Sequence, residues 1–117
     1  MKEILAKAKN DATGKIKVIS NTEEAAIDAD VLYTDTWVST GKEKEKDGRI
    51  EDLMLYQLNA NIIKKAKKDC IVMHCLPAHR GEEITDDVVD GPRSIVFEQA
   101  ANRLVVGQAI LEACIGC

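Results

Sequence analysis

The residues of this chain that could do chemistry gather in the stretch "IVMHCLPAHRGEE", residues 71–83. It holds both histidines of the chain, His74 and His79, and it places Cys75 between them. A thiol next to an imidazole could act as a nucleophile with its general base. Cys75 and His79 could instead form part of a zinc site, although no further ligands lie nearby in the sequence.

Other residues extend this candidate site. Pro77 excludes a helix and favours extended backbone at Leu76, so the loop should keep a fixed shape and could offer backbone carbonyls to a ligand. Arg103 lies in a predicted helix that is otherwise rich in apolar residues, where its planar guanidinium could clamp a carbonyl or phosphate oxygen. Asp35 follows a predicted strand and could hold an ammonium group.

Each of these residues also has a purely structural interpretation. Cys75 taken alone is most often an inert buried thiol, and His74 alone is more often a hydrogen-bonded structural residue. Arg103 could make a surface ion pair that contributes little, and Asp35 could cap a turn. Their joint placement in the predicted fold is what favours a functional site.

Apolar periodicity and N-cap candidates, among them Asn21 and Asn59, predict alternating helices and strands. Helices are expected at 3–11, from 21 onward, and at 49–58, 59–68, 85–90 and 101–114; strands are expected at 15–20, 30–34, 69–76 and 94–99. This alternation, with strands that are apolar almost throughout, indicates an α/β fold. We expect a three-layer, Rossmann-like parallel sheet of about four strands with flanking helices.

In such sheets, ligands bind beyond the carboxyl ends of the strands. Asp35, the segment 74–77 and the segment 99–103 each follow or end a predicted strand. The long loop at 35–48 is either functional or disordered. The pattern alone therefore predicts an α/β protein with a site for a small anion or an amino acid.

Composition narrows the class of protein. The 117 residues are 45% hydrophobic and 31% charged, with a net charge of −4, which argues against nucleic acid or an anionic membrane as the main partner. Neither a signal peptide nor a membrane span is expected, so a cytoplasmic protein with reduced cysteines is predicted. The terminal "CIGC" has a redox or zinc spacing, but it lacks a second ligand pair and is interpreted as a helix end.

Two segments resemble the ornithine carbamoyltransferases. "MHCLPAHRGEEITDDVVDGPRSIVFEQAANRL" resembles the C-terminal part of that family, with its H-C-L-P-A-H-R-G-E-E signature, and "ADVLYTDTWVSTGKEKE" resembles its ornithine loop, D-x-W-x-S-M-G. The resemblance implies transfer of a carbamoyl group from carbamoyl phosphate to ornithine, giving citrulline and phosphate in arginine biosynthesis. It implies no metal and no organic cofactor.

The resemblance also implies roles for individual residues. Asp35 and Ser39 would contact the amino-acid end of ornithine. Cys75 and the Leu76 carbonyl would lie at the reacting centre, and Arg103 would bind the carbamoyl oxygen. In this scheme Cys75 is not a covalent nucleophile.

His74 and Thr40 complete the substrate residues that the resemblance implies. The histidine shapes the substrate loop, whereas Thr40 stands where the family usually has methionine. Ala101 and Val105 replace a family acid and a family histidine in the "ANRLVVG" segment. These departures affect the apolar contact to ornithine and the surroundings of Arg103.

Length sets further expectations. The family's chains run to roughly twice this length or more, so residues 1–117 are expected to be a single partial domain, the C-terminal ornithine-binding domain. Without the S-x-R-T phosphate loop the chain should be inactive alone. The strand at 15–20 would lack its neighbour, which predicts re-pairing or self-association, and the family is trimeric. The alternative is a non-catalytic, amino-acid-binding or self-associating remnant of that domain.

Overall fold

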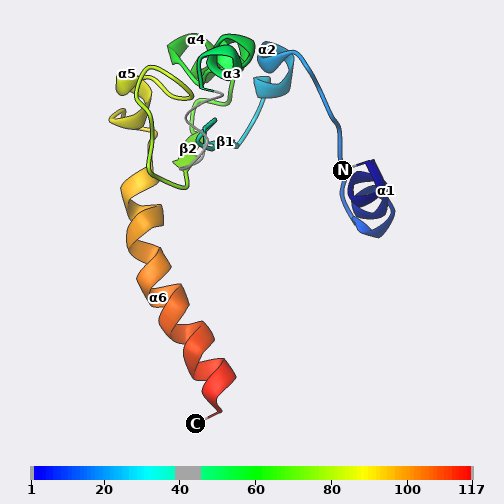
Figure 1. Ribbon diagram of the computed structural model, residues 1–117, viewed down its shortest axis with the longest axis vertical. Coiled ribbons are helices and arrows are strands. Elements are labelled where there is room, and N and C mark those ends of the chain that lie inside the picture. Colours follow the sequence, from blue (N-terminus) through cyan, green and yellow to red (C-terminus); the bar gives the residue numbers. More distant parts are fainter. Residues whose placement is uncertain (1, 39–45, 117) are drawn as a thin grey trace.

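The protein is described here by a computed structural model that covers residues 2–38 and 46–116. Ser39 and Thr40 lie outside the described residues. The elements follow the order α1 (Lys2–Asp11), α2 (Thr22–Ala26), β1 (Val31–Thr34), α3 (Lys46–Leu53), a 3-10 turn (Met54–Tyr56), α4 (Ala60–Ile63), β2 (Ile71–His74), α5 (Asp86–Val89) and α6 (Val96–Ile115). Figure 1 shows their arrangement.

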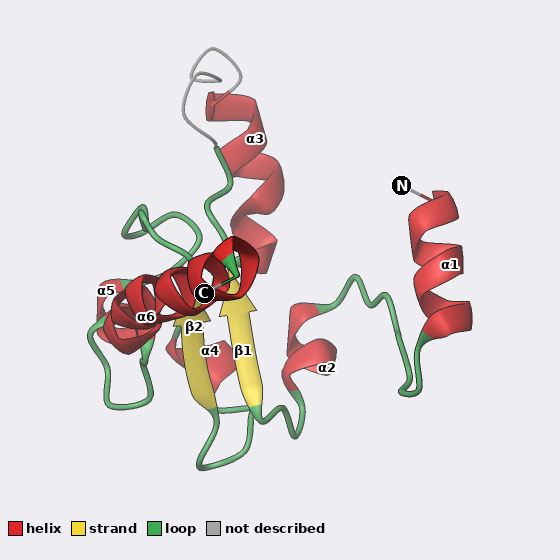
Figure 2. Cartoon of the chain, turned by 90° about the horizontal axis from the view of Figure 1, so that it is seen from below, coloured by secondary structure: helices red, strands yellow, loops and turns green. Residues whose placement is uncertain are grey.

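The two strands form a parallel sheet (Figure 2). The register runs from Val31 opposite Ile71 to Thr34 opposite His74. Parallel strands need a crossover of a dozen or more residues, and here α3, the 3-10 turn and α4 provide it. The chain therefore has the partial α/β, Rossmann-like fold that the alternating pattern predicts.

The core lies where α2, α4, α5 and the start of α6 meet β2. Its buried members are Ala26, Leu58, Ile62, Val72, Ile84, Val88, Val89 and Val96. Along β2, Val72 and His74 face this core, whereas Ile71 and Met73 are only half-buried, as the two-residue period of a strand requires. Val31 and Tyr33 of β1 are exposed on the opposite face.

Two helices begin at the capping residues that the sequence indicated. The Asn21 side chain accepts a hydrogen bond from the backbone N–H of Glu24 at the start of α2. The Asn59 side chain accepts from the N–H groups of Asn61 and Ile62 at the start of α4. Each cap pairs donors that the first turn of a helix leaves unsatisfied.

Two of the four predicted strands do not form. Residues 15–20 run unpaired between α1 and α2, because no described segment lies beside them to complete a ladder of backbone hydrogen bonds. The segment 94–99 makes one bridge, from Ser94 to Val72, and α6 begins at Val96. The β-branched residues there suggested a strand, but the "EQAANRL" residues that follow favour helix, so the last helix starts five residues before the prediction.

Helix α6 extends away from this body in Figure 1, and α1 stands apart from it in both views (Figures 1 and 2). Most large apolar side chains of α6 are more than half exposed: Phe97, Leu104, Val105, Val106, Ile110, Leu111 and Ile115. A helix that is apolar on nearly all sides is normally covered by another surface. Among the described residues, no helix is both long and apolar enough to cross a membrane.

Ile84 tests the position of the core. Its side chain is fully buried between the loop after β2 and the segment before α4. Ile84→Val should lower the free energy of unfolding by roughly 0.5–1.5 kcal/mol, because it removes one buried methylene. Urea denaturation followed by circular dichroism measures the change.

Val18→Ala is the control for that experiment. Val18 is 71% exposed in the unpaired segment before α2, so its truncation should change the free energy of unfolding by less than about 0.5 kcal/mol. Equal effects of the two substitutions would contradict the assignment of the core.

Candidate functional site

The carboxyl ends of the two strands bring Asp35 and Cys75 into contact. Because Thr34 pairs with His74, the residue that follows each strand emerges at the same edge of the sheet. The Cys75 thiol donates a hydrogen bond to Asp35 Oδ1 at 2.7 Å. Asp35 also accepts from the backbone N–H of Thr36 at 2.7 Å. The sequence predicted that Asp35 and the segment 74–77 would lie at the same edge of the sheet, but it did not predict the hydrogen bond between the two side chains.

Asp35 and Cys75 shift each other's pKa. The hydrogen bond from Cys75, helped by the one from Thr36, lowers the pKa of the exposed Asp35 carboxyl, which is therefore an anion at neutral pH. Burial raises the pKa of the Cys75 thiol, and the Asp35 carboxylate raises it further. A carboxylate beside a neutral thiol suits the binding of a cationic ligand, and it argues against Cys75 as a thiolate nucleophile.

Leu76 departs from the geometry that its neighbour Pro77 predicted. Its φ is 58°, in the left-handed region, and not extended. The peptide bond between Leu76 and Pro77 is cis. A left-handed conformation costs an ordinary L-residue roughly 1–2 kcal/mol, so the surrounding hydrogen bonds must hold it.

One of those hydrogen bonds ends on His74. The Leu76 N–H donates to His74 Nδ1 at 2.8 Å, and the opposite ring nitrogen, Nε2, lies 3.0 Å from Glu83 Oε1. The His74 and Glu83 side chains are fully buried. The imidazole therefore points into the protein and contacts the backbone of the loop that contains Cys75. A role of His74 in substrate binding stays a prediction.

The second histidine lies at the other end of the same loop. The His79 N–H donates to Glu83 Oε1 at 2.6 Å, and His79 Nδ1 shares a 2.8 Å hydrogen bond with Thr36 Oγ1. The Cys75 thiol donates its hydrogen bond to Asp35 rather than to a histidine. Cys75 and the histidines therefore do not form the nucleophile and general base that their residue types allowed.

A third element reaches the site from α6. Gln99 Oε1 accepts a hydrogen bond from the His74 backbone N–H at 3.1 Å, and Gln99 Nε2 donates to the Tyr33 hydroxyl at 3.1 Å. Arg103 is exposed one turn further along the same face, about 6 Å along the helix axis. Arg103 thus lies on the helix that meets the carboxyl end of β2.

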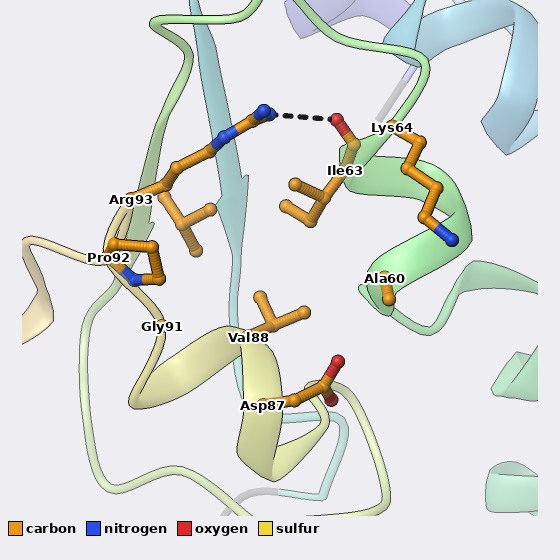
Figure 3. A pocket seen from close by; sticks show the side chains of 9 residues that line it. Ala60, Ile63, Lys64, Asp87, Val88, Gly91, Pro92 and Arg93 are labelled. Atoms are coloured by element: carbon orange, nitrogen blue, oxygen red, sulfur yellow. Dashed lines mark hydrogen bonds between the residues drawn. The ribbon is translucent and has the colours of Figure 1, made fainter.

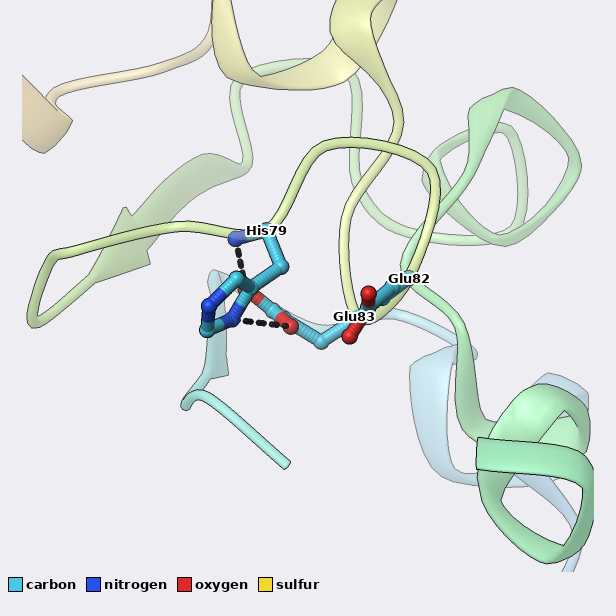
Figure 4. A group of neighbouring side chains, drawn as sticks. All are labelled: His79, Glu82 and Glu83. Atoms are coloured by element: carbon cyan, nitrogen blue, oxygen red, sulfur yellow. Dashed lines mark hydrogen bonds and ion pairs between the residues drawn. The ribbon is translucent and has the colours of Figure 1, made fainter. Parts of the chain in front are cut away.

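Part of this loop has the donor types of a metal site. Ligand atoms of His79, Glu82 and Glu83 lie within 4.8 Å of one another (Figure 4). Glu83 Oε1 already accepts two hydrogen bonds, and His79 Nδ1 is engaged with Thr36. These contacts make the group part of a hydrogen-bond network, and Cys75 does not belong to it.

A cavity of about 210 Å³ lies elsewhere, between α4, α5 and the segment before α6 (Figure 3). Its lining includes the apolar Val88 and Ile63 and the charged Lys64 and Asp87. The Arg93 guanidinium donates hydrogen bonds to the carbonyl oxygens of Ile63 and Lys67. This cavity shares no lining residue with the Asp35–Cys75 contact.

The sequence did not indicate the contacts that three residues make in this site: Thr36, Glu83 and Gln99. Glu83 sits in the same charged stretch as His79, but an acid flanked by arginine and a second acid normally indicates a solvated loop. The sequence feature that could have indicated a contact is the position of Glu83, nine residues after His74 and four after His79.

The chain is similar to known proteins over most of its length. The family model described as "Aspartate/ornithine carbamoyltransferase, Asp/Orn binding domain" matches residues 1–114. An ornithine carbamoyltransferase of Methanoculleus marisnigri is 53% identical over 100 residues, which cover 86% of this chain and 32% of that protein. One of Archaeoglobus fulgidus is 48% identical over 114 residues, which cover 97% of this chain and 37% of that protein.

A solved structure agrees with these matches. The ornithine carbamoyltransferase from Pyrococcus furiosus superposes with a TM-score of 0.88 at 43% identity, over 96% of this chain and 37% of that one. The chain therefore spans about a third of the length of the relatives it matches.

The contact between Asp35 and Cys75 predicts a change in thiol reactivity. Asp35→Asn removes the negative charge that raises the Cys75 pKa, so more thiolate is present at a given pH. The rate of Cys75 alkylation by iodoacetamide at pH 8 should rise roughly three- to tenfold, since the gain in thiolate outweighs its lower nucleophilicity. Mass spectrometry of the modified peptides measures the rate.

The exposed Cys114 provides an internal reference in the same sample. Asp90→Asn, which removes a remote exposed carboxylate that pairs with Arg80, is the control variant. An unchanged Cys75 rate in Asp35→Asn, or an equal rise in Asp90→Asn, would contradict the contact.

Proposed function

This chain belongs to the aspartate/ornithine carbamoyltransferase family, and we propose that it carries the ornithine-binding side of a carbamoyl transfer that yields citrulline and phosphate. The observation that carries the proposal is the contact between Asp35 and Cys75 at the carboxyl ends of β1 and β2. It places an anion and a neutral thiol next to each other in the part of the chain that matches the Asp/Orn binding domain.

The charges of the site suit an amino acid with a cationic group. Asp35 is exposed and negatively charged, so it can hold the α-ammonium group of ornithine, with Ser39 completing that end. Thr40 stands in the sequence where the family usually has the methionine that contacts the ornithine chain. The Cys75 thiol and the Leu76 carbonyl would meet the δ-amine. His74 contributes through its hydrogen bond to the Leu76 backbone.

The transfer step needs a stabilised oxyanion. The neutral δ-amine attacks the carbonyl carbon of carbamoyl phosphate, a C–N bond forms, and the bond from that carbon to the phosphate oxygen breaks. The proton that the amine loses passes to the departing phosphate. Arg103 would stabilise the negative charge on the carbonyl oxygen in the transition state. No group of the chain is needed as a covalent intermediate, which agrees with the raised pKa of Cys75.

Carbamoyl phosphate needs a further site. No S-x-R-T segment occurs in the 117 residues, and the chain spans about a third of its relatives. We infer that the phosphate is held by residues outside this chain, so these 117 residues are inactive alone. Arginine biosynthesis in the cytoplasm is the setting that we propose for the complete activity.

Self-association is the second part of the proposal. The reason inferred from the sequence, an unpaired strand at 15–20, does not apply because that strand does not form. The apolar side chains of α6 supply another, since they leave a 20-residue helix mostly uncovered. A second copy of this chain, packed along α6, would bury them, and this agrees with a family that forms trimers.

Citrulline formation tests the carbamoyl transfer. The purified chain should give no citrulline from carbamoyl phosphate and ornithine by itself. Activity should appear when the part of the Archaeoglobus fulgidus relative that this chain does not match is added in trans. Arg103→Gln should lower the restored rate about 10²–10³-fold because it removes an oxyanion donor.

Lys68→Gln is the matched control, since it removes an exposed cation far along the chain from Arg103. Its restored rate should equal that of the unmodified chain. Full activity of the chain alone, or a restored rate that Arg103→Gln leaves unchanged, would refute the assignment.

Sedimentation velocity tests the association through α6. The chain should sediment as a concentration-dependent oligomer, and Leu104→Lys should shift it towards the monomer by placing a charge on the apolar surface. Ile4→Lys, on the exposed side of α1, is the control and should leave the distribution unchanged. A strictly monomeric chain at all concentrations would contradict this part of the proposal.

A further inference from the structure

A buried chain of hydrogen bonds lies beneath the Asp35–Cys75 contact. It begins at Glu83, passes through the His74 ring and ends on the Leu76 N–H, which adjoins Cys75. The Glu83 and His74 side chains are both fully buried, so water does not compete for these hydrogen bonds. A buried carboxyl group and imidazole are expensive unless they are paired, which indicates a specific reason for their presence.

The donors in this chain determine where the His74 proton lies. A backbone N–H can only donate, so Leu76 requires His74 Nδ1 to be an unprotonated acceptor. The ring proton must then be on Nε2, from which it is donated to Glu83 Oε1 at 3.0 Å. Glu83 therefore selects the tautomer that can hold the Leu76 backbone.

A second branch ties the far end of the loop to the same oxygen. Glu83 Oε1 also accepts from the His79 N–H at 2.6 Å. The His79 ring reaches Thr36, which follows Asp35, at 2.8 Å. Glu83 Oε2 lies 3.7 Å from His79 Nδ1 (Figure 4). One carboxyl group thus joins both ends of the loop that contains Cys75.

The loop needs such a restraint. Leu76 is in the left-handed region, and Cys75 must keep its thiol 2.7 Å from Asp35. We propose that Glu83 and His74 are positioning residues: through the Leu76 N–H they hold the Leu76 carbonyl and the Cys75 thiol in the orientation that receives the substrate amine. The identity of that amine rests on the proposed function; the positioning of the loop does not.

The tautomer of His74 is the first measurement. Long-range ¹H–¹⁵N correlation spectra of the chain labelled with ¹⁵N-histidine distinguish the two tautomers. We expect a single Nε2–H form for His74. Glu83→Gln should retain it, because the amide oxygen can accept both hydrogen bonds. Glu83→Leu should yield mixed tautomers and a shifted Leu76 amide, because it removes the acceptor.

The reactivity of Cys75 is the second measurement. Loosening the loop separates the thiol from Asp35, so alkylation of Cys75 in Glu83→Leu should rise about threefold or more, because the carboxylate then disfavours the thiolate less. Glu83→Gln should stay near the unmodified chain. Ile84→Val is the control, because it destabilises the same segment without touching a hydrogen bond of the network.

An Nδ1–H tautomer in the unmodified chain would overturn the proposal, as would unchanged Cys75 reactivity in a folded Glu83→Leu chain. Equal changes in Ile84→Val would show a general loss of stability, and would overturn it too. If Glu83→Leu does not fold, as judged by circular dichroism, Glu83→Asp replaces it; its shorter side chain should give an intermediate Cys75 rate, and an unmodified rate would overturn the proposal.

Ornithine separates this proposal from the proposed function. Ornithine added to the unmodified chain should shift the amide signals of Asp35 and Cys75. If no shift occurs while the tautomer and alkylation results are as expected, the ornithine assignment fails and the positioning network stands. If ornithine shifts the signals but Glu83→Leu behaves as the unmodified chain does, the network fails alone.

Discussion

The parallel register of β1 against β2 is the constraint on which the site depends. It pairs Thr34 with His74, so Asp35 and Cys75 leave the sheet side by side. A slip of one residue would turn every side chain of one strand to the opposite face. Val72 and His74 would then leave the core, and the thiol would lose its carboxylate partner. The same pairing therefore supports both the packing and the chemistry.

Polar groups occupy part of a small core, and this has a consequence for stability. His74 and Glu83 are as deeply buried as Val72 and Ile84. Apolar residues of similar size would stabilise such a core at least as well, because desolvation of a carboxyl group and an imidazole offsets what their hydrogen bonds contribute. Retaining the pair is reasonable where a loop needs one defined conformation more than it needs extra stability.

The distribution of apolar side chains also shows which apolar surfaces of the chain stay exposed. Val31 and Tyr33 expose one face of β1, and most large apolar residues of α6 face solvent. The core itself is made by short helices packed on β2. A chain that spans about a third of its relatives can bury one side of its sheet, but it has no described segment that covers the other side or the long helix.

The sequence by itself determined the α/β class, the helix caps at Asn21 and Asn59, and the common sheet edge at which Asp35 and Cys75 lie. Those features depend on local periodicity, on side chains that pair with their own neighbouring backbone, and on the common edge of parallel strands. Only the tertiary structure decided that residues 15–20 stay unpaired and that α6 replaces a fourth strand, because strand formation requires a partner in space. Only the tertiary structure showed that Glu83 is buried, because a carboxyl group in a charged stretch of sequence gives no sign of burial. In the folded chain both histidines contact it.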